Sequence, residues 1–401
     1  MKYISIAELG RVVTGKTPPT DHSEYFGGEI PFITPSDIET YDKRYVEYTE
    51  RTLTTQGASS IKGCLLPPKS ICFVCIGSTI GKSCMTKCVS YTNQQINSII
   101  PNQSCIGDYL FYLLKYIKGY FQSVGGGTGS GKGIVNKTLF QKTKVMIHND
   151  LNVQQRIASI LSAYDDLIEN NNRRIKILEK MSENLYKEWF VRFRFPGHEQ
   201  AEFENGIPKG WERVRLSDII DFNPTIKKTN HSEYKIIPMS ALSNTGLLID
   251  DSLYETSGKL EGSRSCNGDT LVARITPCLE NGKTGFVQGL KPGEVVGGST
   301  EFIVMRAKVI SRLLVYFIAR DPLFRGFAIA SMNGADGRQR VKVEKLERTQ
   351  WIKPDGHINA AFEEKCEPIF GLIYKLYREN KNLTKQRDKL LPRLMSGKLE
   401  V

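Results

Sequence analysis

The chain has 401 residues, of which 40% are hydrophobic and 24% charged, a composition ordinary for globular domains that bury their own cores. No apolar run approaches the ~18 residues of a membrane span, and the first residues lack a signal peptide's apolar core, so we expect a cytoplasmic protein without membrane partners. The formal net charge of +12 favours a polyanionic partner, above all nucleic acid.

The second half of the chain repeats the first. The offset of about 200 to 210 residues is too long for a solenoid, so two homologous modules follow one another on one polypeptide. The matches, in chain order, are Ile33, Ser36 and Ile38 with Ile237, Ser240 and Leu242, Gly81-Lys82 with Gly282-Lys283, Leu139 with Leu346, and Glu169-Asn170 with Glu379-Asn380.

The patterns predict an α+β protein. Short strands broken by Gly, Pro and Asn turns fill each module, and one amphipathic helix comes late in each, at 109–121 and 311–324. We expect two pseudo-twofold-related globular units with small mixed sheets, joined by two long helices that form an antiparallel coiled coil. The expected ranges are 1–150 for the first globular unit, 151–192 for the first long helix, 193–206 for a linker, 207–358 for the second globular unit and 359–397 for the second long helix.

Loops of the first unit carry side chains suited to DNA. Lys can donate to guanine, and Asn or Gln can pair with both the donor and the acceptor of adenine. Since any solvated loop has such residues, simple solvation is the alternative for each of them. The candidates are Lys16, Thr17, Ser36, Lys82, Asn93, Gln94, Gln95 and Lys132.

Two glycine-rich stretches of this unit resemble a phosphate-binding loop. Residues 125–133 read GGGTGSGKG, but Gly133 stands where a hydroxyl would hold Mg²⁺, and the segment follows a helix instead of a strand. Residues 77–83 follow a strand, but their first glycine is one residue too close. The second module keeps the turn at 282–284 while Pro277-Cys278 replaces its front. A turn near DNA therefore explains both copies better than a nucleotide site.

The nine cysteines are an odd number scattered along the chain, which argues against a disulfide framework. Cys72, Cys75, Cys84 and Cys88 have spacings near those of zinc ligands. Cys72 and Cys75 nevertheless lie in an apolar, strand-like run, and the second module carries residues 271–273, Leu-Val-Ala, in that neighbourhood. We therefore expect structural thiols and no metal.

The first long helix has apolar residues at alternating spacings of three and four, which is typical of a coiled-coil seam. One Asn stands in the middle, and a buried Asn in such a seam fixes the register of the pairing. The expected seam residues are Ile157, Ile160, Tyr164, Leu167, Asn171, Leu178 and Leu185.

The second globular unit supplies a further set of loop candidates, more basic than the first. Its catalytic signatures are incomplete: residues 321–324 resemble an adenine methyltransferase motif that Leu323 breaks, and the nuclease-like run 363–365 begins a helix instead of lying on a strand. We expect no catalytic residue on this chain. The DNA candidates are Ser240, Arg274, Asn281, Lys283, Arg338, Gln339 and Arg340.

The second long helix repeats the seam and again places one Asn in its middle. Two antiparallel helices of ~35 residues make a rod of about 50 Å, which could hold two globular units apart. The alternative, that each helix packs only on its own unit, is less attractive for a matched pair. The expected seam residues are Ile369, Ile373, Leu376, Asn380, Leu383, Leu390 and Leu394.

Three segments resemble the specificity (S) subunit of type I restriction-modification systems, the HsdS family. They read LYKEWFVRFRFPG at 185–197, PKGW at 208–211 and LLPRLMSGKLEV at 390–401, and the similarity extends over the whole chain. These motifs lie in the helical regions and the linker, outside the loops that we expect to contact DNA.

The resemblance implies two target-recognition domains that each read one half of an asymmetric, bipartite site on double-stranded DNA. It also implies that the helices dock modification subunits, two of them, which bind S-adenosylmethionine and methylate adenine, and that restriction subunits using ATP and Mg²⁺ join. This chain itself would carry no cofactor. The alternatives are a stand-alone DNA-binding or scaffold protein without modification partners, or a P-loop NTPase.

Overall fold

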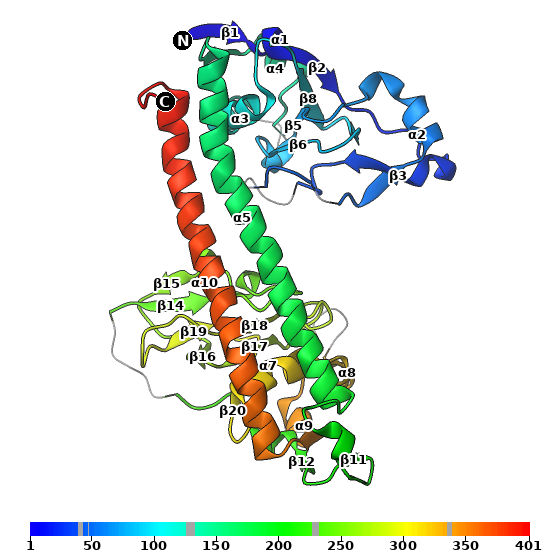
Figure 1. Ribbon diagram of the computed structural model, residues 1–401, viewed down its shortest axis with the longest axis vertical. Helices are drawn as coiled ribbons and strands as arrows, with labels where there is room; N and C mark the ends of the chain where they lie inside the picture. The colour runs from blue at the N-terminus through cyan, green and yellow to red at the C-terminus, as the bar shows by residue number, and fades with distance from the viewer. Residues whose placement is uncertain (39–42, 47, 126–132, 227–231, 335–338) are drawn as a thin grey trace. The chain divides into compact units, whose positions relative to one another are not determined.

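The structure is a computed structural model that describes residues 1–38, 43–46, 48–125, 133–226, 232–334 and 339–401 (Figure 1). Contacts divide the chain into two units. Unit 1 consists of Met1–Asn170 with Asn380–Val401, and unit 2 of Asn171–Glu379. Both long helices therefore contribute residues to both units.

Unit 1 is built on a four-stranded antiparallel sheet in the order β2-β8-β5-β6. Every residue of β5 is buried, as expected of a strand covered on both faces. The strands are β2 (Gly10–Thr14), β5 (Ile71–Val74), β6 (Ser83–Met85) and β8 (Ile96–Pro101). Helix α3 (Gly107–Gly125) shares one hydrophobic core with this sheet, which confirms the helix expected at 109–121.

A smaller sheet of unit 1 has the order β4-β3-β7, in which β7 runs parallel to β3. The two ends of the globular part meet as an antiparallel pair, β1 with β9. The elements are β1 (Lys2–Ser5), α1 (Ile6–Leu9), β3 (Phe26–Ile33), β4 (Arg51–Leu53), α2 (Thr55–Ser60), β7 (Tyr91–Thr92), α4 (Lys137–Lys142) and β9 (Lys144–Ile147).

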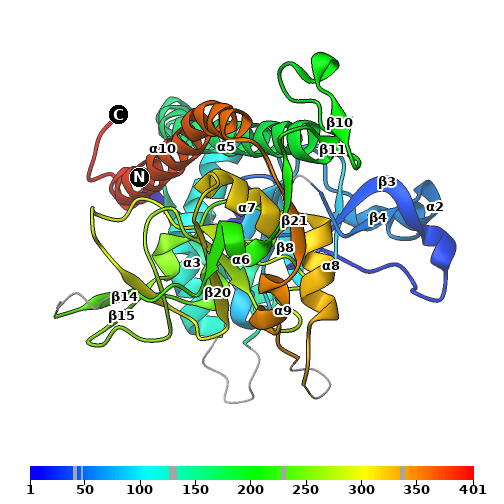
Figure 2. The same ribbon diagram turned by 90° about the horizontal axis from the view of Figure 1, so that it is seen from below.

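Unit 2 repeats this topology. Its central sheet has the order β13-β20-β17-β18, its second sheet β15-β14-β19-β16 again contains a parallel pair, and β12 pairs with β21. Figure 2 shows β14 and β15 side by side. The strands are β12 (Glu212–Arg215), β13 (Ile220–Phe222), β14 (Tyr234–Ile237), β15 (Glu255–Ser257), β16 (Ser263–Ser265), β17 (Thr270–Ala273), β18 (Thr284–Phe286), β19 (Val296–Gly298), β20 (Phe302–Ala307) and β21 (Gln350–Lys353). The matching strand orders confirm the internal duplication.

The late helix of the globular part differs between the two units. Where unit 1 has the continuous helix α3, unit 2 has α7 (Arg312–Arg320) followed by α8 (Pro322–Ala330), so the single helix expected at 311–324 is wrong. Asp321 caps the second helix by accepting a hydrogen bond from the Leu323 N–H (2.8 Å), and Pro322 occupies the first helical position, where its missing N–H costs nothing. The shorter helices are α6 (Leu216–Ile219) and α9 (Val343–Glu347).

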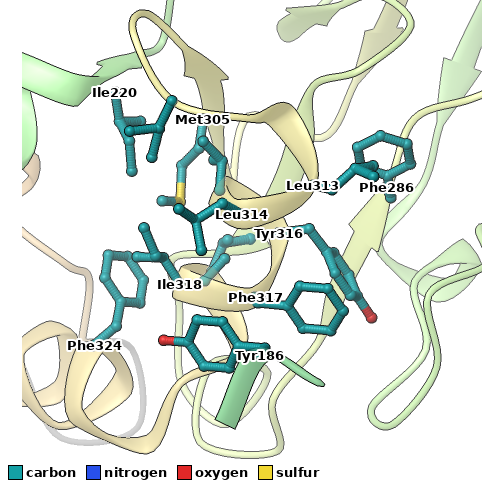
Figure 3. Close-up of a cluster of buried hydrophobic side chains, with 14 of the residues drawn as sticks. Tyr186, Ile220, Phe286, Met305, Leu313, Leu314, Tyr316, Phe317, Ile318 and Phe324 are labelled. Atoms are coloured by element: carbon teal, nitrogen blue, oxygen red, sulfur yellow. The ribbon is translucent and has the colours of Figure 1, made fainter. Parts of the chain in front are cut away.

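The core of unit 2 is rich in aromatic side chains. Tyr316 and Phe317 on α7 are buried between the central sheet and the two long helices, and Figure 3 shows the Tyr186 ring beside Phe317. These two rings are stacked with their centroids 5.4 Å apart. The Tyr186 hydroxyl donates to Asp321 over 2.7 Å, so the helix cap also anchors the end of the first long helix.

The long helices are α5 (Leu151–Tyr186), which continues into a π-helical turn at Lys187–Val191, and α10 (Gly356–Met395). They run antiparallel inside each unit. In unit 1, Ile157 and Leu161 of α5 share a core with Leu391 and Leu394 of α10. In unit 2, Trp189 and Phe362 are in ring contact at 5.9 Å. Two long helices therefore form an antiparallel pair, as the sequence predicted.

The seam differs from the predicted one along α5. Leu167 is 48% exposed, so its assignment to the seam is wrong, and Ile160, Tyr164, Leu178 and Leu185 are only half-buried. The buried positions of α5 include instead Leu161, Asp165, Asn171, Ile175, Ser182 and Tyr186, together with the expected Ile157. A stripe that contains Asp165 and Ser182 cannot be found from the spacing of apolar residues alone.

Along α10 the buried face is nearer to the prediction. Ile369, Leu383 and Leu390 are half-buried, and Arg387 is buried as well. Ile373, Leu376, Asn380 and Leu394 are all buried.

The buried Arg387 explains the polar position in α5. Its guanidinium Nη1 donates to Asp165 Oδ1 over 2.5 Å, and the two side chains are only 1% and 5% exposed. The Tyr112 hydroxyl donates to the second oxygen of the same carboxylate, also over 2.5 Å. The negative charge of Asp165 raises the pKa of Arg387, against burial, which alone would lower it. The helix contact of unit 1 thus contains a buried ion pair.

The segment 193–206, expected as a linker, packs on unit 2. Phe193 and Phe195 contact the Trp211 ring at centroid distances of 5.6 and 5.2 Å, and the Trp211 indole N–H donates to Asp355. A short hairpin follows, β10 (Phe203–Glu204) with β11 (Ile207–Pro208). Among the helices of the described residues, none combines the length and the apolar composition that crossing a membrane requires.

Candidate nucleic-acid interface

In unit 1 the loop between β7 and β8 is tied to two other segments by backbone hydrogen bonds. The Asn93 N–H donates to the Ile33 carbonyl (3.2 Å), and the Asn93 side-chain oxygen accepts from the Gln95 N–H (3.1 Å). The Gln95 carbonyl accepts from the Cys75 N–H (2.9 Å), whose own carbonyl accepts from the Val135 N–H (2.8 Å). Three loops far apart in the chain are therefore fixed together at the end of the central sheet where β5 ends and β8 begins.

Unit 2 builds the same arrangement from different residues. The Ser299 N–H donates to the Ile237 carbonyl (3.1 Å), and the Ser299 hydroxyl accepts from the Glu301 N–H (3.2 Å). The Glu301 carbonyl accepts from the Arg274 N–H (2.9 Å), and the Arg274 carbonyl from the Val341 N–H (2.9 Å). Each of these four hydrogen bonds corresponds to one of those described for unit 1.

We call these three loops the loop frame of each unit. It consists of residues 75–77, 93–95 and 133–135 in unit 1, and of 274–276, 299–301 and 339–341 in unit 2. In this correspondence Cys75 matches Arg274, Gln95 matches Glu301 and Ile134 matches Arg340. The backbone is repeated, whereas the side chains at these positions differ in charge.

The loop frame of unit 2 is ionic. The Arg340 guanidinium donates to both oxygens of Glu301 through Nε (2.9 and 3.0 Å) and again through Nη2 (2.6 Å). Arg274 Nε lies 3.8 Å from the same carboxylate. The hydrogen bonds from Arg340 lower the pKa of the Glu301 carboxyl, so it is ionised at neutral pH. Two cations share one anion, which leaves the cluster with a net positive charge.

The loop frame of unit 1 is neutral. The Thr17 hydroxyl donates to Gln94 Oε1 (2.8 Å), and the Asn93 amide donates to Gln95 Oε1 (3.3 Å). Burial raises the pKa of the Cys75 thiol to about 12, which keeps it uncharged. Ile134 is 56% exposed at the position that corresponds to Arg340. This surface offers amide groups and an apolar side chain.

A hollow of about 410 Å³ adjoins the loop frame of unit 2. Its lining includes Asn223, Arg264, Arg274 and Thr300. Within the described residues, the buried Arg274 Nε has no hydrogen-bond partner, since its distance to the Glu301 carboxylate is too long. A buried donor without a partner costs stability, and the Arg274 Nε–H is available to an acceptor that enters the hollow.

The two Gly-Lys turns lie outside the loop frames and differ in the use of their lysine. Each connects two antiparallel strands, β5 with β6 and β17 with β18, whereas a phosphate-binding loop leads from a strand into a helix. The Lys283 ammonium group donates to the Met239 carbonyl (3.0 Å), so one of its donors is used inside the fold, and its assignment as a DNA contact stays a prediction. Lys82 is half-buried.

The other candidates fall into three groups. Lys16, Ser36, Ser240 and Asn281 are exposed, and the Lys16 N–H binds the Thr92 carbonyl next to the loop frame of unit 1. Gln339 belongs to the loop frame of unit 2, where its N–H donates to the Thr276 hydroxyl. Lys132 and Arg338 lie outside the described residues.

The structure adds Ser299, Thr300 and Glu301 to the candidates of unit 2, which the sequence reasoning missed. Strand β8 pairs with β5 in the same register as β20 pairs with β17, so the residues before β20 correspond to 93–95 before β8. An alignment of the two modules continued through this loop would have found them.

Three of the four cysteines considered as zinc ligands, Cys72, Cys75 and Cys84, are buried core residues, whereas Cys88 is exposed. Cys72 and Cys84 face each other across β5 and β6, both fully buried. Within the described ranges, no three His, Cys, Asp or Glu side chains lie close enough together to hold a metal ion.

Comparisons with known proteins agree on one family. The family model described as "Type I restriction modification DNA specificity domain" matches residues 1–180. The chain is 30% identical to the MjaIX specificity subunit of Methanocaldococcus jannaschii, over 99% of this chain and 93% of that one, and 30% identical to the HindI specificity subunit of Haemophilus influenzae, over 43% and 37%.

A crystal structure shares the fold. The type I restriction-modification S subunit from M. genitalium superposes with a TM-score of 0.58 and 11% identity, covering 98% of this chain and 96% of that one. Two duplicated units, paired long helices and this degree of similarity to a full-length relative lead to one conclusion. The chain belongs to the family of type I restriction-modification specificity subunits.

Proposed function

We propose that this chain selects the DNA sequence on which a type I restriction-modification complex acts, with each globular part reading one half of a bipartite, asymmetric site. The observation that carries the proposal is the pair of loop frames, which have the same backbone and different side chains. A repeated backbone can approach two similar grooves in the same way, and different side chains then read different bases. The net charge of +12 supports DNA as the partner.

The long helices would set the spacing between the two half-sites. Helix α5 has 36 residues, which at 1.5 Å per residue is about 54 Å. This length exceeds one turn of DNA, about 34 Å, so the proposal includes a spacer of unspecified sequence between the half-sites.

The same helices would dock modification subunits, two for the two half-sites. These partners would bind S-adenosylmethionine and methylate adenine, and restriction subunits with ATP and Mg²⁺ would join them. The chain itself performs no chemistry in this proposal. The incomplete catalytic motifs and the helix break at Asp321, which caps α8 instead of forming an active site, support this assignment. The complex would act in the cytoplasm, where its DNA is.

Methylome sequencing tests the proposal directly. Cells that express the modification subunits with and without this chain are compared, and we expect one bipartite adenine-methylation motif that depends on the chain. Purified full-length chain should also co-purify with the modification subunits. A chain that binds DNA but neither creates a methylation motif nor retains these subunits would be a stand-alone DNA-binding protein, and the proposal would be wrong.

A further inference from the structure

We infer that the two half-sites differ in base class: unit 2 contacts a guanine through Arg340, which Glu301 holds in place, while the loop frame of unit 1 faces an A·T pair. This inference rests on the proposed function and extends it to a chemical identity for each half-site. It depends on three observations in the loop frames, namely the ion pair, the shared charge and the neutral copy.

The first observation is the geometry of the ion pair. Arg340 reaches both oxygens of Glu301, so the plane of its guanidinium is fixed by the carboxylate. A fixed guanidinium offers its remaining N–H groups in defined directions, and the paired acceptors O6 and N7 of guanine are the base edge that such a fork fits. Glu301 is in this sense a positioning residue, because it acts through Arg340.

The second observation is the charge. Arg274 and Arg340 share the single carboxylate of Glu301, and Arg274 is too far from it for a hydrogen bond. The cluster therefore keeps one uncompensated positive charge beside the hollow lined by Arg264 and Asn223. The major-groove edge of guanine, with its two acceptors O6 and N7, compensates this charge. The amino group that adenine or cytosine presents in the major groove is a donor and does not compensate it.

The third observation is that the described residues 75–77, 93–95 and 133–135, which form the loop frame of unit 1, include no charged side chain. Gln95 stands where unit 2 has Glu301, and the exposed Ile134 stands where it has Arg340. An amide can pair with adenine, and an apolar side chain can contact the thymine methyl group. The same backbone thus presents chemistry for G·C in one unit and for A·T in the other.

The test uses purified full-length chain and duplexes that carry its methylation motif with each base pair replaced in turn. In the wild-type protein one G·C pair of one half-site should be strongly preferred. In Arg340→Ala this preference should fall by about 5- to 150-fold, the range for loss of one bidentate base contact, while the other half-site is read as before.

Glu301→Gln keeps the shape of the side chain and removes its charge. We expect it to weaken the same G·C preference, and to weaken that preference no further when Arg340 is already alanine, because Glu301 positions the proposed guanine contact through Arg340. The matched control is Arg312→Ala, which breaks another exposed Arg–Glu pair of unit 2, also 2.6 Å long, outside the loop frame. This control should leave every base preference unchanged.

Two results would overturn the inference and leave the proposed function intact. One is that Arg340→Ala shows the same preference as the wild type at every G·C pair of the motif. The other is an equal loss of affinity for all duplexes in that variant, which indicates a phosphate contact. A wild-type chain that prefers no bipartite sequence at all would instead contradict the proposed function.

Discussion

Units 1 and 2 share a hydrogen-bonded backbone and differ where their side chains leave it. The order of strands in the central sheet, the parallel pair in the second sheet and the links within the loop frame recur in both. At three positions of the loop frame, unit 1 has Cys75, Gln95 and Ile134 where unit 2 has Arg274, Glu301 and Arg340. The comparison shows how the side chains of a loop frame can change without disturbing the fold, because the backbone hydrogen bonds that hold the three loops together are the same in both units.

The helix contacts of the two units also differ in chemistry. In unit 1 the pair α5 and α10 buries the ion pair of Asp165 with Arg387, supported by Tyr112. In unit 2 the same two helices bury Trp189 against Phe362 among further aromatic rings. A buried ion pair costs desolvation and penalises any slipped register, whereas apolar packing contributes stability with less demand on register. We therefore expect the two contacts to respond differently to substitution.

The largest expected effect is at the ion pair. Arg387→Ala leaves the Asp165 carboxylate buried without its cation, so the free energy of unfolding should fall by about 3–5 kcal/mol. Denaturant titrations followed by circular dichroism measure this loss. All three tryptophans, Trp189, Trp211 and Trp351, belong to unit 2. Tryptophan fluorescence should consequently shift less than circular dichroism if the two units unfold separately.

Two variants sharpen this result. Asp165→Leu combined with Arg387→Met removes both charges and should recover part of the lost stability, since an apolar pair replaces the ion pair while the buried Tyr112 hydroxyl loses its acceptor. Phe362→Ala should lower the free energy of unfolding by about 3–5 kcal/mol. Because Phe362 lies in unit 2 with all three tryptophans, this loss should appear more strongly in tryptophan fluorescence than in circular dichroism. Equal shifts of both signals in every variant would show that the units unfold together, and full stability of Arg387→Ala would contradict the role of the ion pair.

The next effect concerns the neutral loop frame. Gln95→Ala should relax the preference at one base pair by about 1–3 kcal/mol, in the half-site that Arg340→Ala leaves unchanged. The methylation motif of each variant, read by methylome sequencing, gives this measurement. Gln103→Ala, which changes an exposed glutamine of unit 1 outside the loop frame, is the control. An identical motif for Gln95→Ala and the wild type would remove Gln95 from the interface.

Much of the architecture was predictable, because its signals are local or periodic. The internal repeat and the long helices are visible in spacing alone. The seam was misplaced at Leu167 because Asp165, the residue actually buried, is charged, and an apolar pattern cannot reveal an ion pair whose partner lies more than two hundred residues away. Glu301 was missed for a similar reason: its partner Arg340 is distant in sequence, and only the folded backbone brings the two together.

A smaller effect is expected from phosphate contacts, which position the protein without reading sequence. Lys16 is exposed beside the loop frame of unit 1, so Lys16→Ala should weaken binding to all duplexes alike. The slope of log affinity against log salt should fall by about 1, the contribution of one phosphate. Affinities measured over a salt series check this. A changed base preference at constant slope would instead make Lys16 a base contact.

The smallest expected effect is a pH dependence of the stability of unit 2 that comes from Glu179. Burial raises the pKa of Glu179 in unit 2, although a hydrogen bond from the Leu247 N–H and the charges of Arg320 and Lys176 oppose the rise. Because the folded pKa lies above the ordinary value of 4.5, this group's contribution to stability is complete below that pH and is lost as pH rises through the folded pKa. Glu179→Gln keeps an acceptor for Leu247 and removes the charge.

The variant should therefore match the wild type at low pH and exceed it slightly at neutral pH, by roughly 0.5 kcal/mol, the scale of a substitution away from the core. The difference should appear in tryptophan fluorescence, since Glu179 and all three tryptophans belong to unit 2. A gain of the same size at every pH would mean that the side chain acts through packing. A loss at neutral pH would mean that its ionised form is held more favourably in the folded protein than in water, reversing the sign argued from burial.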